Sequence, residues 1–90
     1  DKNYIPDFFL PNGVILEVKG RFMIEDRKKH LFIKAQHPDL DIRFVFDNPT
    51  RKLYKGGKMT YGDWCDKHGY MYCKLKEGIP QSWLDKRGAR

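Results

Sequence analysis

The chain has 90 residues, with 18 Lys and Arg against 12 Asp and Glu, and a net charge of +6. This length fits one small domain spanning residues 1–90, and because its core is marginal we expect it either to dimerise or to be part of a longer protein. No stretch approaches an apolar membrane span or has the pattern of a signal peptide, so we expect a cytoplasmic protein without membrane contacts.

The first predicted unit is a β-hairpin. Ile5–Leu10 is apolar and is predicted as a strand, and Val14–Lys19 is predicted as its partner. The turn-forming sequence Pro11–Gly13 joins the two.

A helix and a third strand follow. Residues Glu25–Gln36 are good helix formers, Pro38 ends the helix, and an apolar stripe is predicted on Leu31, Phe32 and Ala35. Ile42–Phe46 is apolar at nearly every position, which is typical of a strand buried on both faces. The order strand, helix, strand predicts that Ile42–Phe46 runs parallel to the second hairpin strand, through a right-handed crossover.

The last third of the chain is predicted to be less regular. Residues 47–58 are polar and contain Asn-Pro and Gly-Gly, so they are predicted as loop. Thr60 and Asp63 form a capping-box pattern for a helix that Gly69 ends. A short strand over Tyr70–Leu75 and a final helical turn over Ile79–Leu84 complete the prediction.

The chain contains few candidates for thiol or zinc chemistry. Cys65 and Cys73 do not form a Cys-x-x-Cys pair, so we expect two reduced thiols. With His68 they are loosely spaced like part of a zinc site, but no fourth ligand is evident. A core thiol at Cys65 and a surface imidazole at His68 are the favoured interpretation, and no general base is assigned to any histidine. Trp64 and Trp83 are expected to pack in the core.

The hairpin carries charges in an otherwise apolar stretch. Either a solvent-exposed face explains Asp7, Glu17 and Lys19, or the three converge to do chemistry. Side chains alternate along a strand, so Glu17 and Lys19 share a face. A two-residue loop would turn Asp7 away from Glu17, whereas the three-residue loop that Pro11 and Gly13 favour would pair Asp7 with Glu17.

Paired carboxylates predict a metal site on this face. Two like charges in proximity repel unless a cation lies between them, and oxygen ligands without a converging His or Cys favour Mg²⁺ or Mn²⁺. Such an ion activates water and stabilises a phosphoryl transition state, and Lys19 would add a fixed positive charge beside it. A surface ion pair between Lys19 and an acid is the equally weighted alternative.

Basic side chains predict a polyanionic partner, most commonly nucleic acid. Arg27, Lys28 and Lys29 begin the predicted helix, with Lys28 on the apolar stripe and leaning toward the site, and Arg27 and Lys29 pointing outward. Around Tyr54, the predicted loop carries a second basic group, which consists of Arg51, Lys52, Lys55 and Lys58. Contacts to DNA phosphates explain both groups, and a solvated basic surface explains them as well.

The hairpin residues also carry a family resemblance. The segment PDFFLPNGVILEVKG resembles the PD-(D/E)xK nuclease signature, with Asp7 after Pro6 and with Glu17-Val18-Lys19. Together with YIPDFFLPNG, DRKKHLFIKAQHPDLDIRFVF, KLYKG, YGDWCDKHG and IPQSWL, the chain resembles phage endonuclease I, the Holliday-junction resolvase family of short-tailed coliphages. The resemblance extends from Tyr4 to Leu84.

The resemblance implies an α/β, restriction-endonuclease-like mixed sheet with flanking helices and three catalytic residues. Asp7 and Glu17 would be metal ligands together with the Val18 carbonyl, and Lys19 would be the catalytic lysine. DNA-contacting side chains would be Arg27, Lys28, Lys29, Lys52 and Lys55.

The resemblance further implies cleavage of four-way and other branched DNA junctions in the cytoplasm of a phage-infected bacterium. Family members are domain-swapped homodimers in which a glutamate on an N-terminal helix completes the site of the other subunit. That helix has no counterpart in this sequence, so we expect the chain to be the C-terminal portion of a longer protein. The alternatives are a site-specific homing or repair endonuclease and a DNA-binding module without catalysis.

Overall fold

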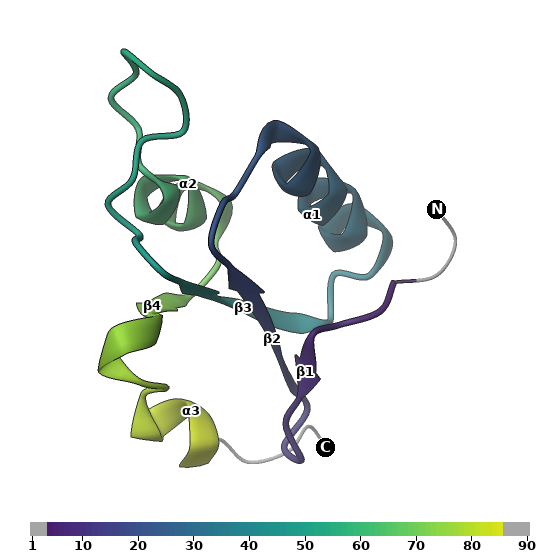
Figure 1. The fold of residues 1–90 in the computed structure, drawn as a ribbon. Helices are drawn as coiled ribbons and strands as arrows, with labels where there is room; N and C mark the ends of the chain where they lie inside the picture. Colours follow the sequence, from purple (N-terminus) through teal and green to yellow (C-terminus); the bar gives the residue numbers. More distant parts are fainter. Residues whose placement is uncertain (1–3, 86–90) are drawn as a thin grey trace.

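The structure is a computed structural model that describes residues 4–85 (Figure 1). Its elements alternate between strands and helices, which confirms the predicted α/β class with a mixed sheet and flanking helices. In chain order they are β1 (Phe8–Phe9), β2 (Val14–Lys19), α1 (Ile24–Gln36), β3 (Asp41–Phe46), α2 (Tyr61–His68), β4 (Tyr72–Lys74), the 3-10 helix η1 (Leu75–Glu77) and α3 (Gln81–Asp85).

The strands of the described residues form one four-stranded sheet in the order β1-β2-β3-β4. β1 is antiparallel to β2, whereas β3 is parallel to both of its neighbours. The short strand predicted over Tyr70–Leu75 is observed as β4, which joins the sheet at the edge beside β3. The predicted first strand is longer than the observed one, since β1 has two residues.

The hairpin has the three-residue loop that its turn sequence favours. Leu10 N–H donates to the Val14 carbonyl at 2.8 Å, and Gly13 has φ +92°, in the left-handed region where glycine is favoured. Asn12 ties the loop to the far end of the chain, because its Nδ2 donates to the Trp83 carbonyl at 2.8 Å. Phe8 pairs with Leu16 in the resulting register.

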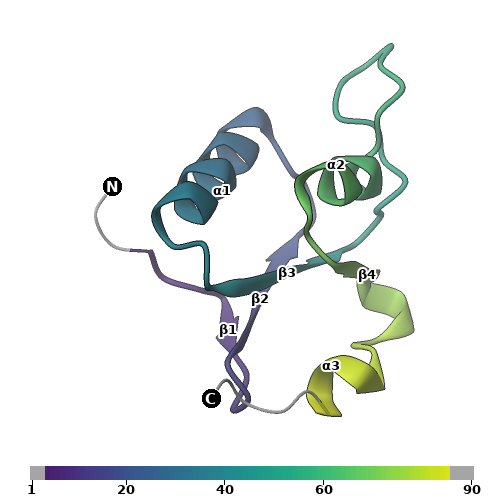
Figure 2. The ribbon, with the colours of Figure 1, turned by 180° about the vertical axis from the view of Figure 1, so that it is seen from behind.

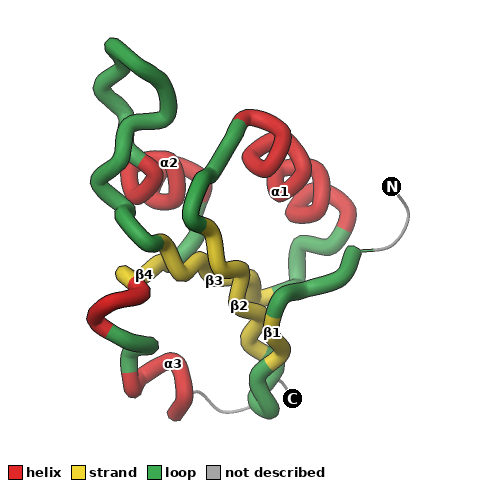
Figure 3. The backbone as a smooth tube through the Cα atoms, in the orientation of Figure 1, coloured by secondary structure: helices red, strands yellow, loops and turns green. Residues whose placement is uncertain are grey.

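Helices cover both faces of the sheet, as Figures 2 and 3 show: α1 and α2 lie on one side and α3 on the other. The α1/α2 side holds the larger core cluster, which includes Phe22, Phe44, Phe46 and Trp64. A smaller cluster of Val14, Leu16, Val45 and Trp83 lies on the α3 side. The expectation that both tryptophans pack in the core is confirmed.

The predicted buried face of α1 is wrong. The helix buries His30 and Ile33, whereas Leu31, Phe32 and Ala35 are exposed. His30 and Ile33 lie three residues apart on one face, and Tyr70 Oη donates to the backbone carbonyl of His30 at 2.8 Å. Lys28 is exposed, as is Phe32, and the two line a groove together with Tyr4.

The start and end of α2 agree with its sequence. Thr60 Oγ1 accepts from Asp63 N–H at 3.0 Å, Asp63 Oδ2 accepts from Thr60 N–H at 3.0 Å, and Gly69 closes the helix at φ +76°. Cys65 is buried and is a free thiol, as is the half-buried Cys73. None of the helices in the described part of the chain is long and apolar enough to cross a membrane.

Candidate active site

Glu17 is a buried carboxylate in the sheet. It lies on the same side of β2 as Ile15, which packs in the α1/α2 core cluster, and its relative exposure is 2%. Burial of an ionised carboxylate is costly unless partners compensate for it. A solvent-exposed face therefore does not explain this charge, and Glu17 must be held by its neighbours.

Asp7 lies across the hairpin from Glu17. The pairing of Phe8 with Leu16, continued by one residue, places Asp7 opposite Glu17, as the three-residue loop predicts. Asp7 Oδ2 accepts from the Val18 N–H at 2.9 Å, and this bond fixes the exposed carboxylate against β2. The structure thus brings the predicted residues Asp7, Glu17 and Val18 together at one edge.

Lys19 extends the same face at the carboxyl end of β2. Its Nζ is 3.7 Å from Glu17 Oε1 and 3.6 Å from Asp26 Oδ1, with the lysine side chain 16% exposed. The predicted alternative, an ion pair between Lys19 and an acid, is present. Its partner Glu17 on β2 is buried, so it is not a surface ion pair. Lys19 therefore bridges an interior carboxylate and one at the start of α1.

Tyr4 and His30 also contact Glu17, and neither was predicted as a site residue. Tyr4 Oη donates to Glu17 Oε2 at 2.5 Å, and His30 Nε2 lies 3.8 Å from Glu17 Oε1. The two rings meet edge to face, with centroids 6.0 Å apart and an interplanar angle of 88°. Tyr4 lies outside any predicted strand, and His30 is a polar residue outside the predicted apolar stripe, so neither gave a periodic signal.

Burial sets the protonation of both side chains. Burial, followed by the positive charges of Lys19 and Lys29, lowers the pKa of His30 to about 4, against the opposing effects of Asp26 and Asp7. His30 is thus neutral near pH 7, and its contact with Glu17 is not an ion pair. Burial, followed by the hydrogen bond to Glu17, raises the pKa of Tyr4, which keeps its hydroxyl protonated as a donor.

The donor set of the edge fits a hard divalent cation. Asp7 and Glu17 each give one oxygen to a bond within the protein, and a carboxylate has about four acceptor positions, so acceptor capacity remains on each. Among residues 4–85, no group of three His, Cys, Asp or Glu side chains is close enough to hold a metal ion. Asp7, Glu17 and the Val18 carbonyl are thus a partial set of oxygen ligands, of the kind that Mg²⁺ and Mn²⁺ prefer.

The predicted DNA-contacting side chains lie in two places. Lys28 and Lys29 line a groove of about 580 Å³ together with Tyr4 and Ile33. Arg27 is partly engaged, because its Nη1 donates to the Phe22 carbonyl at 2.6 Å. The second group is on the loop after β3, which extends away from the sheet beyond α2 in Figure 1.

That loop begins next to the candidate site. Asp47 N–H donates to the Lys19 carbonyl at 3.3 Å, so the loop leaves β3 at the end of the sheet where Lys19 lies. Lys52 is exposed and its Nζ donates to the Gly57 carbonyl at 3.2 Å, while Lys55 is exposed near Tyr54.

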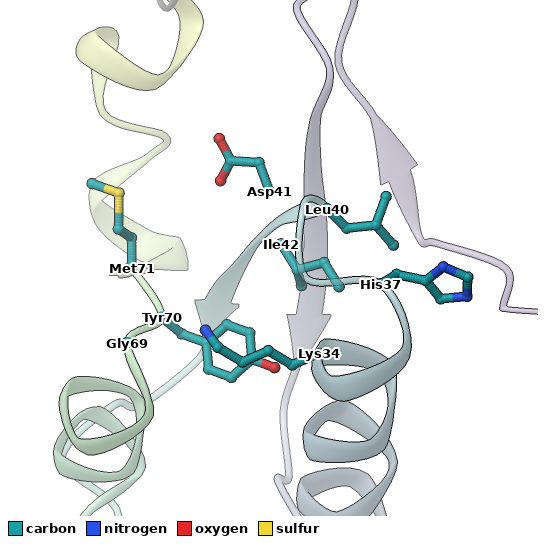
Figure 4. A pocket seen from close by; sticks show the side chains of 8 residues that line it. All are labelled: Lys34, His37, Leu40, Asp41, Ile42, Gly69, Tyr70 and Met71. Carbon is teal, nitrogen blue, oxygen red and sulfur yellow. The ribbon is translucent and has the colours of Figure 1, made fainter. Parts of the chain in front are cut away.

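A smaller cavity of about 150 Å³ lies at the opposite end of the parallel strands (Figure 4). Asp41, at the start of β3, is among its lining residues and pairs with Val14, at the start of β2. Lys34 Nζ lies 4.4 Å from the Tyr70 ring centroid in its wall. None of the predicted site residues lines this cavity, so the candidate site is at the Glu17 and Lys19 end.

Comparison with known proteins shows the family of the chain. Residues 1–90 match the family described as phage endonuclease I. Endodeoxyribonuclease 1 of Enterobacteria phage T3 is 56% identical over 72 residues, which cover 80% of this chain and 47% of that protein. Endonuclease I of Escherichia phage T7 is 52% identical over 82 residues, which cover 90% of this chain and 53% of that protein. The chain spans about half the length of these curated relatives, and it belongs to the phage endonuclease I family.

Proposed function

We propose that the chain is the catalytic part of a metal-dependent endodeoxyribonuclease that resolves four-way (Holliday) and other branched DNA junctions. The observation that carries the proposal is the buried Glu17 carboxylate, which lies across from Asp7 with Lys19 Nζ 3.7 Å away. Two relatives named endonuclease or endodeoxyribonuclease support the reaction class.

Asp7, Glu17 and the Val18 carbonyl would hold Mg²⁺ or Mn²⁺. When bound, the ion would supply an activated water and neutralise charge on the phosphate. The Val18 N–H keeps Asp7 in place, and the burial of Glu17 keeps solvent from one side of the site. Lys19 places its ammonium where charge develops on the phosphorane, and this charge lowers the barrier more than it strengthens ground-state binding.

DNA binding in this proposal depends on the basic side chains around the site. Arg27, Lys28 and Lys29 on α1 and Lys52 and Lys55 on the loop after β3 would contact phosphates, which orient a duplex without reading its sequence. Selectivity for junctions and a domain-swapped homodimer follow from the family resemblance. The proposed location is the cytoplasm of a phage-infected bacterium.

Cleavage assays separate this proposal from its alternatives. The intact natural protein is incubated with a four-way junction, a nicked duplex and a plain duplex of matched sequence, with Mg²⁺ or with a chelator. We expect Mg²⁺-dependent cleavage of the junction far above that of the plain duplex, and its loss in Asp7→Asn. Cleavage of plain duplex at one sequence would instead indicate a homing or repair enzyme, and binding without cleavage would indicate a DNA-binding module.

A further inference from the structure

We infer that Tyr4 and His30 are positioning residues that fix the orientation of the Glu17 carboxylate, an inference that rests on the proposed function. Both contact Glu17 from outside the predicted catalytic set, one at each oxygen. Tyr4 is near the N-terminus and His30 is in α1, so the carboxylate is held between two separate segments.

The Tyr4 hydrogen bond decides which oxygen faces the site. A glutamate side chain has three rotatable torsions, and a buried one without a partner could present either oxygen. The Tyr4 hydroxyl binds Oε2 at 2.5 Å, which leaves Oε1 directed at Lys19 Nζ, 3.7 Å away. Hydrogen bonds of this type to a ligating carboxylate set its direction and its basicity.

His30 closes the other side of the carboxylate. It is fully buried, its ring meets Phe44 edge to face at 4.9 Å, and within the described residues neither ring nitrogen has a hydrogen-bond partner. An unsatisfied polar group in an aromatic core lowers stability, and an apolar ring would avoid this. Glu17 Oε1 lies 3.8 Å from its Nε2, so the ring packs against the carboxylate and limits how far it can turn.

A matched pair of hydroxyl deletions tests Tyr4. Tyr4→Phe removes the bond to Glu17, whereas Tyr70→Phe removes a buried bond to the backbone carbonyl of His30. We measure Mn²⁺ affinity by calorimetry, together with the Mg²⁺ concentration for half-maximal junction cleavage, in the intact protein. Tyr4→Phe should weaken Mn²⁺ binding about tenfold, with cleavage recovered at high Mg²⁺, and Tyr70→Phe should leave both within about twofold.

His30→Phe tests the second contact by separating stability from site geometry. The variant should unfold at the same or a higher urea concentration than the wild type, because two unsatisfied nitrogens are removed. Its Mn²⁺ affinity should nevertheless fall about tenfold. A variant that binds Mn²⁺ like the wild type would overturn the role of His30.

The outcomes keep this inference distinct from the proposed function. If the wild type binds Mn²⁺ and cleaves junctions but Tyr4→Phe behaves like Tyr70→Phe, the positioning role is wrong and the nuclease assignment stands. If Tyr4→Phe binds Mn²⁺ more tightly, the tyrosine competes with the ion and the inference is also overturned. If the wild type neither binds Mn²⁺ nor cleaves, both proposals fail together.

Discussion

β2 and β3 are neighbours with the same length and direction but different chemistry at matched positions. In their parallel register, Glu17 pairs with Phe44 and Lys19 pairs with Phe46. Phe44 and Phe46 are fully buried and both pack on Phe22. The core at this end of the sheet is thus supplied by β3, while β2 provides charged side chains at the same level.

The position of each strand in the sheet explains the difference. Both strands have a partner on each side, but β4 pairs with β3 at Phe44–Phe46, whereas β1 has only two residues among those described and pairs with β2 at Ile15 and Leu16. Beyond this short strand the edge of β2 is open, and Asp7 approaches it with a side chain instead of a backbone ladder. The comparison predicts that β3 substitutions change stability and that β2 substitutions change chemistry.

Phe44→Ala should produce the largest effect. The ring is fully buried among aromatic neighbours, so its removal should lower the free energy of unfolding by about 3–5 kcal/mol. Urea denaturation measures the change, and Phe44→Leu, which retains most of the volume, should lose clearly less. A loss below about 1 kcal/mol would show that β3 is not the source of stability at this level.

Lys19→Ala should affect cleavage and spare folding. Loss of a positive charge next to the reacting phosphate should lower the single-turnover rate about 10²–10³-fold, with junction affinity and the urea midpoint nearly unchanged. Lys34→Ala removes the same charge near the other end of the sheet and should retain the wild-type rate. Equal losses in binding and in rate would instead make Lys19 an ordinary phosphate contact.

Glu17→Gln should separate charge from packing on β2. The amide oxygen can still accept the Tyr4 hydrogen bond, so the free energy of unfolding should change by less than about 1 kcal/mol. Mn²⁺ affinity, measured by calorimetry, should fall at least about tenfold. Loss of a direct metal ligand should weaken binding at least as much as loss of a group that supports the ligand. Unchanged affinity would place the metal site elsewhere.

The smallest effects should come from basic residues outside both strands. Single Ala substitutions should each reduce the slope of log DNA affinity against log salt concentration by roughly 1, equally for junction and duplex. The positions are Arg27, Lys29, Lys52 and Lys55. The cleavage rate at saturating DNA should stay the same, in contrast to Lys19→Ala. Four unchanged slopes would mean that this charge is only a solvated surface.

Local chemistry made part of the site predictable. The Pro11–Gly13 sequence favours one loop length, and loop length with strand alternation is sufficient to place Asp7 opposite Glu17. Helix α2 was equally predictable from the sequence, because Thr60, Asp63 and Gly69 each act on backbone groups close in sequence. Such features depend on a few neighbouring residues, so they can be predicted without knowledge of tertiary contacts.

The parts that sequence reasoning missed depend on contacts between distant segments. Apolar periodicity placed Leu31 and Phe32 inside, but α1 turns His30 and Ile33 inward to meet Tyr70 and the sheet. A histidine in the core has no apolar signature. Tyr4 reaches Glu17 across 13 residues from outside any regular element, so no pattern in the chain indicates it.

The site is more sensitive to insertions and deletions in the three-residue hairpin loop than to substitutions there. Removing one residue between Leu10 and Val14 would change the parity of the pairing and send Asp7 to the α3 side of β2, while Glu17 stayed where it is. Removing or adding two would restore the parity but slide Asp7 along the strand. Residues 11–13 can therefore be replaced where the turn is kept. The length of the loop cannot change, because it sets the register that places Asp7 opposite Glu17.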